Sequence, residues 1–500
     1  MRKVLNEQLK LGEVEISKLV FDPKSRDEIP QLLRGLQYIY CNRELKDKVF
    51  ALLEEHIKFS STGRPGMELW KILVMGTLRL NCNWNYDNLK EMVDQHAGIR
   101  EMLGHVRWTD PVTYPMQTLK DNVSLLTPEL LMQINDIVVA AGHNLVKKNA
   151  GELRARCDSF VVETNVHFPT DINLLFDAVR KSVELTVRFC DECGISGWRQ
   201  ADFLLKKMRS QKHHCERLKH STSKDPRKQY KKEQGIKDAH AEYLKQGIKL
   251  IDRVTETTKR ALSQSAVTIM EAAQIVEIDR FVADSRHQIN LVERRVLKGE
   301  IIPHKDKIFS LFETHTEWIC KGKAGTPQEL GLRVGIVEDH YGYILTHMVM
   351  EKAVDSTVAE ALISDAKKRF PKLYSCSTDK GYWSPENQEK LKTVLPVSAI
   401  LKKGRLSQID RERQESAEFK KAHKKHQAVE SAINALENHG LDYCPDRGIK
   451  GFKRYVALAV TARNLQKLGA ELQKQELARL KHSQAIKAGI KRKKESVQAA

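Results

Sequence analysis

Long apolar runs are missing from this chain. No stretch approaches the ~18 consecutive apolar residues that a helix needs to span a bilayer. The opening residues, Met1-Arg-Lys-Val-Leu-Asn-Glu, lead into polar sequence without the apolar segment of a secretory signal. We therefore expect no membrane partner and a cytoplasmic location.

Cysteine is sparse and follows no regular spacing. The nine cysteines are scattered and odd in number, which does not fit a disulfide framework and indicates reduced thiols. One cluster, Cys190-x2-Cys193 followed by His213, His214 and Cys215, contains residue types that bind zinc. The surrounding pattern is helical and lacks a second CxxC pair, so zinc remains the alternative to plain thiols.

Acidic residues are in deficit. The chain has 84 Lys and Arg against 65 Asp and Glu, a formal charge of +19, which indicates a polyanionic partner and most simply nucleic acid. A merely basic soluble protein is the alternative. Gly and Pro are also scarce from Trp198 to Lys298, where long helices with a basic first half are expected. That basic side fits a phosphate backbone or, equally, a solvated helix face.

Helical periodicity dominates the first 150 residues. Residues 1–60 form an N-terminal helical segment, and residues 61–150 form several shorter helices joined by tight turns. Thr127-Pro-Glu129 is a helix start, with Thr as cap and Pro as the first helical residue. The pattern is compatible with a helix-turn-helix DNA-binding region, and a helical bundle without a DNA role fits it equally well.

The rest of the chain alternates strands and helices. Arg154–Asn165 predicts a strand in the middle of a buried sheet, and further strands and helices follow the long helical stretch. The fold class expected is α/β (α+β), a mixed sheet flanked by helices, interrupted by a helical insertion. The expected parts are 151–190 and 301–470 for the sheet domain, 191–300 for the basic insertion, and 471–500 for a basic tail that is frayed over Lys481–Ala500.

Three acids stand where open α/β sheets form active sites. Asp158 lies inside the first strand, Asp379 ends a later strand, and Glu430 lies on a late helix expected over His423–Asn438. A carboxylate buried in a central strand needs a partner or a metal ion, although a strand-end Asp facing water is the plainer alternative. Oxygen ligands suit Mg²⁺ or Mn²⁺, and two such ions about 3.5–4 Å apart promote phosphodiester chemistry.

Four sequence blocks point to one family. They are Gly63-Arg-Pro-Gly-Met-Glu-Leu-Trp70, Cys157-Asp-Ser-Phe-Val-Val-Glu-Thr-Asn-Val-His-Phe-Pro-Thr-Asp171, Thr378-Asp-Lys-Gly-Tyr-Trp-Ser-Pro-Glu-Asn387, and His426-Gln-Ala-Val-Glu-Ser-Ala-Ile with Arg463-Asn-Leu downstream. In this order they resemble the DDE transposases of bacterial insertion sequences, which have an RNase H-like catalytic core and here an InsH-like N-terminal domain. The resemblance covers most of residues 20–470.

The resemblance implies a fold, a reaction and partners. Asp158, Asp379 and Glu430 would form the metal-binding triad of an RNase H-like core and hold two Mg²⁺ ions, with Mn²⁺ as a possible substitute. The reaction implied is cleavage at the ends of the element, followed by strand transfer into target DNA. Partners implied are the terminal repeats, target DNA and a second copy of the chain or more, in the bacterial cytoplasm at the nucleoid.

The chain also departs from the family pattern. Part of the family has a Tyr or His, an Arg and a Lys around the Glu. His423 and His426 precede Glu430 at spacings that predict one shared helix face, and Glu437 occupies the place of the Lys. These histidines are therefore candidate DNA contacts, and the role of the missing Lys is not transferred.

Several assignments have competitors. Lys321 and Lys323, in a Gly-containing turn, are either phosphate contacts or solvated lysines. Glu163, which alternation places on the opposite side of the strand from Asp158, and the later Asp171 and Asp177 compete for the first position of the triad. A catalytically inactive DNA-binding descendant and a metal-dependent nuclease without strand transfer are the alternative functions.

Overall fold

The computed structural model divides the chain into two compact units. One unit comprises Met1–Asn165 with Glu317–Ala500, and the other comprises Val166–Thr316. The structure describes residues 3–6, 8–9, 11–57, 66–106, 110–146, 151–219, 225–264, 268–320 and 328–498, with side chains to residue 486. Each unit has its own apolar core.

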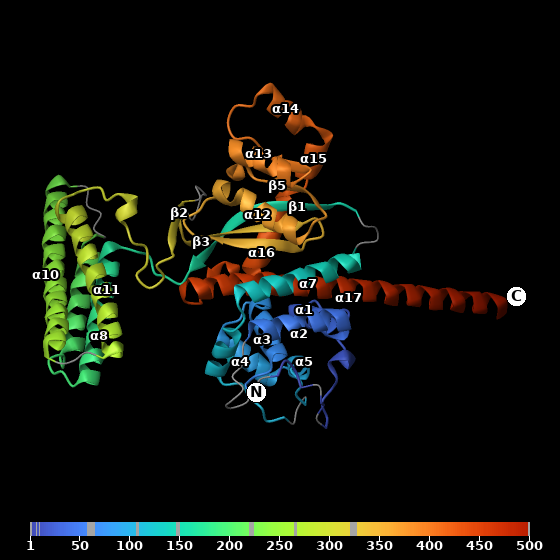
Figure 1. The fold of residues 1–500 in the computed structure, drawn as a ribbon, viewed down its shortest axis with the longest axis horizontal. Helices are drawn as coiled ribbons and strands as arrows, with labels where there is room; N and C mark the ends of the chain where they lie inside the picture. Colours follow the sequence, from blue (N-terminus) through green and yellow to red (C-terminus); the bar gives the residue numbers. More distant parts are fainter. Residues whose placement is uncertain are drawn as a thin grey trace. The chain divides into compact units, whose positions relative to one another are not determined.

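Seven helices form the N-terminal part of the first unit. They are α1 (Glu28–Cys41), α2 (Arg43–His56), α3 (Leu69–Asn81), α4 (Tyr86–Gln95), α5 (Ala97–Met102), α6 (Met116–Val123) and α7 (Pro128–Val146) (Figure 1). Every residue of α3 except Lys71 is buried, so this helix forms the core of the region and has no face free for DNA. No single helix in the described ranges is long and apolar enough to cross a membrane, and only α6 and α7 together, bent by 76°, pass by length and composition.

The C-terminal helix α17 (Gly448–Gln498) ties the first unit together. It packs against α1, α3 and α7, and Asn464 donates a hydrogen bond to Asn135 of α7 (2.7 Å) and another to the carbonyl of Ile344 (2.9 Å). The expectation of a frayed end over Lys481–Ala500 is wrong as far as Gln498, because the helix continues to that residue. The sequence there is rich in Ala, Leu, Glu, Gln and Lys, which favour helix even without packing.

Two glycines allow α1 and α17 to cross in backbone contact. A Cβ on Gly469 would meet the carbonyl oxygen of Gln31, and a Cβ on Gly35 would meet the carbonyl oxygen of Leu465.

Gly469→Ala is expected to lower the free energy of unfolding by about 1–3 kcal/mol or more, because backbone atoms cannot move away from an added methyl group as a flexible side chain can. Gly235→Ala, at a helical site with nothing within 4 Å, is the control, and thermal unfolding should show no loss of stability for it. Equal melting temperatures for Gly469→Ala and Gly235→Ala would contradict the close backbone contact between α1 and α17.

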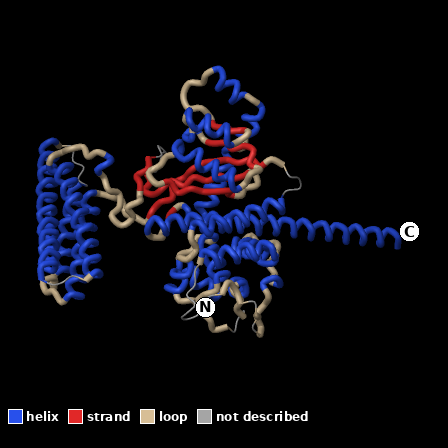
Figure 2. Tube along the Cα trace, in the orientation of Figure 1, coloured by secondary structure: helices blue, strands red, loops and turns tan. Residues whose placement is uncertain are grey.

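The sheet of the first unit is mixed. Its strands are β1 (Leu153–Thr164), β2 (Glu317–Cys320), β3 (Gln328–Asp339), β4 (Ile344–Met350), β5 (Leu373–Thr378), β6 (Val397–Ile400) and β7 (Tyr443–Cys444). The order is β2-β3-β1-β5-β6, with β4 beside β3 and β7 beside β1. β3 runs antiparallel to β1 and to β4, while β5 runs parallel to β1 and β6 runs parallel to β5. Figure 2 shows this sheet in red with helices around it.

Helices cover the two faces of this sheet. On one face, Ala155 and Cys157 of β1 pack with Leu362 of α12 (Asp355–Arg369). On the other face, Phe160 and Val162 share a core with the N-terminal helices and α17. The chain completes the sheet region with α13 (Pro385–Val394) and α14 (Gln408–Glu415). The expected mixed α/β class, with a sheet flanked by helices, is confirmed.

The second unit is a bundle of four long helices. They are α8 (Asp171–Cys193), α9 (Ala201–Lys219), α10 (Pro226–Gln264) and α11 (Ile269–Val292). Their core contains Val179, Met208 and Ile278, and the buried Tyr243 hydroxyl donates to the carbonyl of Ile172 (2.8 Å). The unit is wider than the expected insertion at 191–300, because α8 packs on α9, α10 and α11.

Candidate carboxylate site

Asp158 and Asp379 stand on neighbouring strands. In the parallel pairing of β1 with β5, Cys157 lies opposite Thr378, the last residue of β5. The next position on each chain is Asp158 and Asp379, and Asp379 keeps an extended backbone (φ −70°, ψ 165°). Parallel register therefore places the two carboxylates beside one another, with Asp158 half-buried and Asp379 exposed.

Glu430 joins them from a helix. It is exposed in the first turn of α16 (Val429–Leu436), which lies against β1 (Figure 1). The buried residues of α16, Val429 among them, share a core with Phe160 and Val162. Because side chains alternate along a strand, Phe160 and Val162 lie on the same face of β1 as Asp158. The three predicted triad residues thus belong to one face and one end of the sheet.

The pKa of Asp158 reflects the other carboxylates near it. Burial, together with the negative charges of Asp379, Asp355 and Glu430, raises the pKa of Asp158 to about 6. The hydrogen bond from the backbone N–H of Ser159 (2.8 Å) opposes this rise. Asp158 forms no ion pair with a basic side chain of the described residues, so it lacks the positive partner that a half-buried acid ordinarily has.

Asp355 is a fourth acid that the sequence analysis missed. It begins α12 and accepts a hydrogen bond from the Ser159 hydroxyl (2.6 Å). A Cβ on Gly381, two residues after Asp379, would lie 3.4 Å from its Oδ2 atom. Ser159 points to the opposite face of β1 from Asp158. Asp355 therefore contacts the strand of Asp158 from the other face of the sheet. Its sequence signal, an acid at a helix start, is too common to single it out.

Arg156 is a second missed residue. Its guanidinium forms an ion pair with Glu338 (2.8 Å) and donates to the carbonyls of Asp339 (3.0 Å) and Lys425 (3.3 Å). Arg156 is two residues before Asp158 and so shares its face. Lys425 lies in the connection that leads to Glu430. One buried side chain therefore joins the strand of the first acid to the chain segment that carries the third.

The expectation that His423, His426 and Glu430 share one helix face is wrong. α15 (Ala417–His423) ends before Lys425, a short 3₁₀ turn follows at His426–Ala428, and α16 begins only at Val429. Lys425 leaves the helical conformation (φ −112°, ψ 19°) at this break. The sequence there has neither Gly nor Pro that would predict a helix break. In the structure, the carbonyl of Lys425 accepts a hydrogen bond from Arg156 at the break.

The two histidines nevertheless lie beside Asp379. Their rings are 5.2 Å apart between centroids, and His426 Nδ1 is within hydrogen-bond distance of the Ser377 hydroxyl (3.1 Å). Burial and the neighbouring His423 lower the pKa of His426 to about 4, against the opposing charge of Asp379. Burial likewise lowers the pKa of His423 against the charge of Asp379. Both rings are therefore neutral at pH 7.

The competing acids are placed elsewhere. Glu163 is exposed on β1, an odd number of residues from Asp158 and hence on the other face. Asp171 pairs with Arg295 (3.1 Å) within the second unit. Asp177 also belongs there; burial raises its pKa, but His167 and Arg180 together bring that pKa below its ordinary value. None of the three acts on the pKa of Asp158.

Other predicted ligands are not brought together. Lys321 and Lys323 lie outside the described residues. Cys190 and Cys215 are buried in the core of the second unit, Cys193 contacts Glu271 (3.5 Å), and His213 bonds to Glu216 (2.8 Å). His214 is exposed on α9. Within the described ranges, no group of three or more His, Cys, Asp or Glu side chains is arranged to hold a metal ion.

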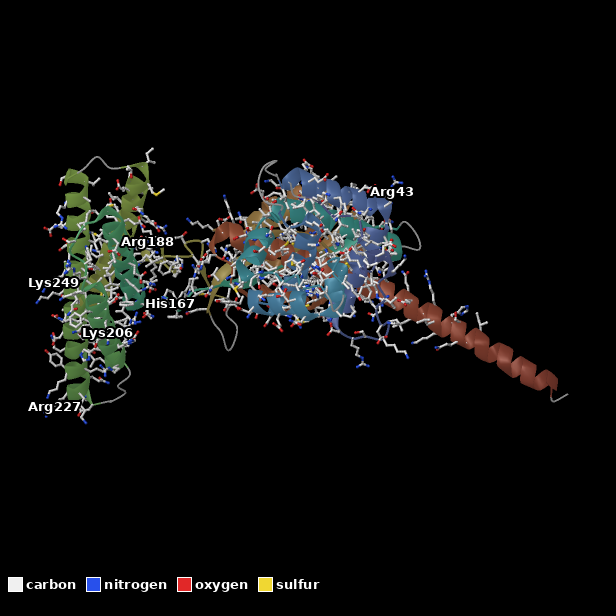
Figure 3. The ribbon with its side chains drawn as sticks, turned by 90° about the horizontal axis from the view of Figure 1, so that it is seen from below. Arg43, His167, Arg188, Lys206, Arg227 and Lys249 are labelled. Carbon is white, nitrogen blue, oxygen red and sulfur yellow. The ribbon has the colours of Figure 1, made fainter. Side chains whose placement is uncertain are left out.

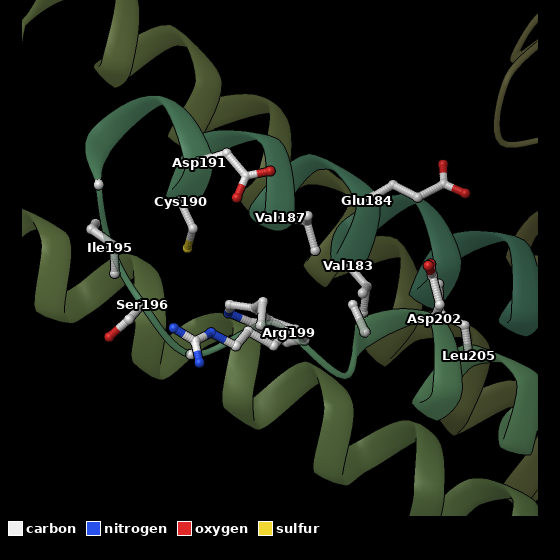
Figure 4. Close-up of a pocket in the computed structure, with 14 residues that line it drawn as sticks. Val183, Glu184, Val187, Cys190, Asp191, Ile195, Ser196, Arg199, Asp202 and Leu205 are labelled. Carbon is white, nitrogen blue, oxygen red and sulfur yellow. The ribbon is translucent and has the colours of Figure 1, made fainter.

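One cavity lies within the second unit. It measures about 590 Å³ and is lined by the end of α8, the following loop and the start of α9 (Figure 4). Its charged residues, Glu184, Asp191, Arg199 and Asp202, are of both signs around an apolar floor that includes Val183 and Cys190.

Neutralising Asp158 is expected to stabilise the metal-free protein. Its folded pKa is about 6 against an ordinary 3.8, so the folded chain binds this proton more tightly and stability falls as pH rises from about 4 to 6. Asp158→Asn should therefore raise the free energy of unfolding at pH 7.5 by about 1–3 kcal/mol. Urea unfolding in EDTA measures this, and the gain should vanish near pH 4. A variant less stable than wild type at pH 7.5 would contradict the uncompensated charge.

Comparison with known proteins identifies no relative. No family model matches the chain, and no curated protein or solved structure matches it significantly. What the site can do follows from its residues. Three carboxylates of one sheet end, with two neutral histidines beside one of them, can supply oxygen ligands and hydrogen bonds but no positive charge of their own.

Proposed function

We propose that the chain is the DDE transposase of a bacterial insertion sequence, with Asp158, Asp379 and Glu430 as its catalytic carboxylates. The observation that carries the proposal is their convergence from β1, the end of β5 and α16, with no described basic side chain in an ion pair with Asp158. The mixed sheet, with β5 parallel and β3 antiparallel to the central β1, supports an RNase H-like core.

The donor set fits Mg²⁺ or Mn²⁺. All three groups offer carboxylate oxygens, the ligands that hard divalent cations prefer, and their mutual repulsion makes a cation favourable. Two bound ions would neutralise this charge and supply the Lewis acidity that phosphodiester cleavage needs. Because no described group is arranged around one ion, side-chain rotation of the carboxylates must accompany binding.

The remaining residues have proposed roles around the DNA. His423 and His426, neutral at pH 7, would contact phosphate oxygens by hydrogen bonds and not by charge, because burial holds their pKa values low. Arg156 would hold the segment before Glu430 in place. The net charge of +19 supports DNA as the partner. We further propose an oligomer that holds two element ends, in the bacterial cytoplasm.

Product analysis tests the reaction class. The full-length protein is incubated with Mg²⁺ and a labelled duplex that carries the sequences flanking its coding region. A transposase releases 3′ ends and joins them to a second duplex. Cleaved ends without joined products would favour the nuclease alternative, and binding without cleavage would favour the inactive descendant. Either result would overturn the proposal.

A further inference from the structure

The second unit carries an unpaired basic surface. Lys206, Lys207 and Arg217 are exposed on α9, and none forms an ion pair with a described residue. The start of α10 adds three more exposed cations without a partner among the described residues, Arg227, Lys228 and Lys231. We call these six residues the α9–α10 basic surface. Figure 3 shows Lys206 and Arg227 among the side chains of this unit.

The two helix segments meet at one end of the bundle. The ammonium group of Lys232 donates to the carbonyl of Lys219 (3.0 Å), which brings the start of α10 to the last turn of α9. From Lys206 to Arg217 a helix advances about 17 Å, at 1.5 Å per residue. A DNA duplex presents a phosphate charge about every 1.7 Å of its axis. The segment of α9 from Lys206 to Arg217 is therefore long enough to face several phosphates.

The later part of α10 shows that this excess is local. Beyond Lys231, exposed cations alternate with acids on the same helix: Lys245 follows Glu242 by three residues, and Lys249 precedes Asp252 by three. Residues three apart on a helix are neighbours, so these charges offset one another. On α9 the described acids are only Asp202, four residues before Lys206, and Glu216, which is already engaged by His213 and Lys212. Six Lys and Arg residues share this helix, so its positive charge is only partly offset.

Aromatic side chains lie within the basic surface. Phe203 is 65% exposed, three residues before Lys206, and Tyr230 is 69% exposed next to Lys231. A solvated helix face has no need of large exposed rings, whereas nucleic-acid surfaces combine cations with aromatic groups that contact sugars and bases.

We infer that the α9–α10 basic surface binds DNA through its phosphate backbone, independently of the carboxylate site. The inference deepens the proposed function, since it assigns part of DNA binding to the inserted unit. It makes binding sequence-independent and strongly dependent on salt, because each neutralised phosphate releases counterions.

A charge-matched pair of variants tests it. The full-length triple variant Lys206→Gln, Lys207→Gln, Arg217→Gln is compared with the control Lys245→Gln, Lys249→Gln, Lys259→Gln. Both remove three exposed charges from helices of the same bundle. Binding to a 30-base-pair duplex of arbitrary sequence is measured in EDTA over a range of salt concentrations. Circular dichroism and thermal unfolding check that both variants fold as wild type does.

The α9 variant should weaken binding by about tenfold or more near physiological salt and reduce the slope of log Kd against log salt by about 2–3. The control should bind as wild type does. Wild-type binding by the α9 variant, or equal weakening in both, would overturn the inference. A further probe is vesicles with anionic lipid: preferential loss of vesicle binding with DNA binding intact would also overturn it. The assay needs no cleavage, so a failed proposed function would show separately as absent Mg²⁺-dependent products.

Discussion

Asp379→Asn is expected to reduce Mg²⁺-dependent DNA cleavage by at least about 10³-fold, because one ligand loses its charge at the point where charge must be neutralised. The side chain keeps its size, and Asp379 is exposed, so the fold should not change. DNA binding should persist or tighten, since a negative charge that faces the backbone is removed. Cleavage rates on end-labelled DNA measure the first effect, and gel-shift titration in EDTA measures the second.

Glu163→Gln is the matched control for that loss. Glu163 is an exposed acid on β1, the same strand as Asp158, but on the opposite face. It should leave both cleavage and binding unchanged. Cleavage by Asp379→Asn at the wild-type rate would remove Asp379 from the site. An equal loss of cleavage in Glu163→Gln would show that the effect does not depend on which acid is replaced. That result would contradict a metal site formed by particular carboxylates.

Arg156→Met is expected to lower the cleavage rate by about 100-fold, because misplacing a reacting group by an ångström costs about that much. Arg156 ties the strand of Asp158 to the carbonyl of Lys425, just ahead of Glu430. Methionine keeps the apolar stem and removes both donors. Cleavage should regain part of its rate at high Mn²⁺, since a displaced Glu430 weakens the site without removing a ligand. The readout is the Mn²⁺ concentration at half-maximal rate.

A control separates this positioning role from general destabilisation. Burial raises the pKa of Glu338 to about 7 even against the opposing charge of Arg156. The unpaired Glu338 of the variant can therefore take up a proton, and the stability loss should stay near 1–3 kcal/mol. Arg154→Met removes a nearby arginine whose one ion pair among the described residues is with the exposed Glu152 (3.5 Å). It should keep the wild-type Mn²⁺ midpoint. An Arg156 variant that loses stability but keeps that midpoint would contradict the positioning role.

The sequence was sufficient for elements whose signals are local. The strand around Asp158 could be predicted from its β-branched residues, and Asp379 from its place at the end of a short strand. A helix at Glu430 was expected over His423–Asn438, and α16 covers Val429–Leu436 of that range. Each signal comes from residues within one turn or one strand, and the mixed α/β class follows from their order.

Tertiary partners explain what was missed. Asp355 reaches Ser159 across 196 positions of sequence, and Arg156 reaches Lys425 across 269. Contacts between residues so far apart in the sequence cannot be predicted from local composition. The break before His426 has the same cause, because helical periodicity runs through Lys425 and only a contact from another strand interrupts it. Likewise, residues 151–190 were assigned to the sheet domain, but α8 packs in the core of the second unit. Helical periodicity cannot show which of two cores covers a helix.

The most direct test of the central claim is a crystal structure of the protein with Mn²⁺, with the metal located by its anomalous scattering. The account predicts Mn²⁺ bound among Asp158, Asp379 and Glu430, with no metal there in Asp379→Asn crystals soaked in the same way. Mn²⁺ absent from this position at concentrations that support DNA cleavage, or bound equally in the variant, would contradict it.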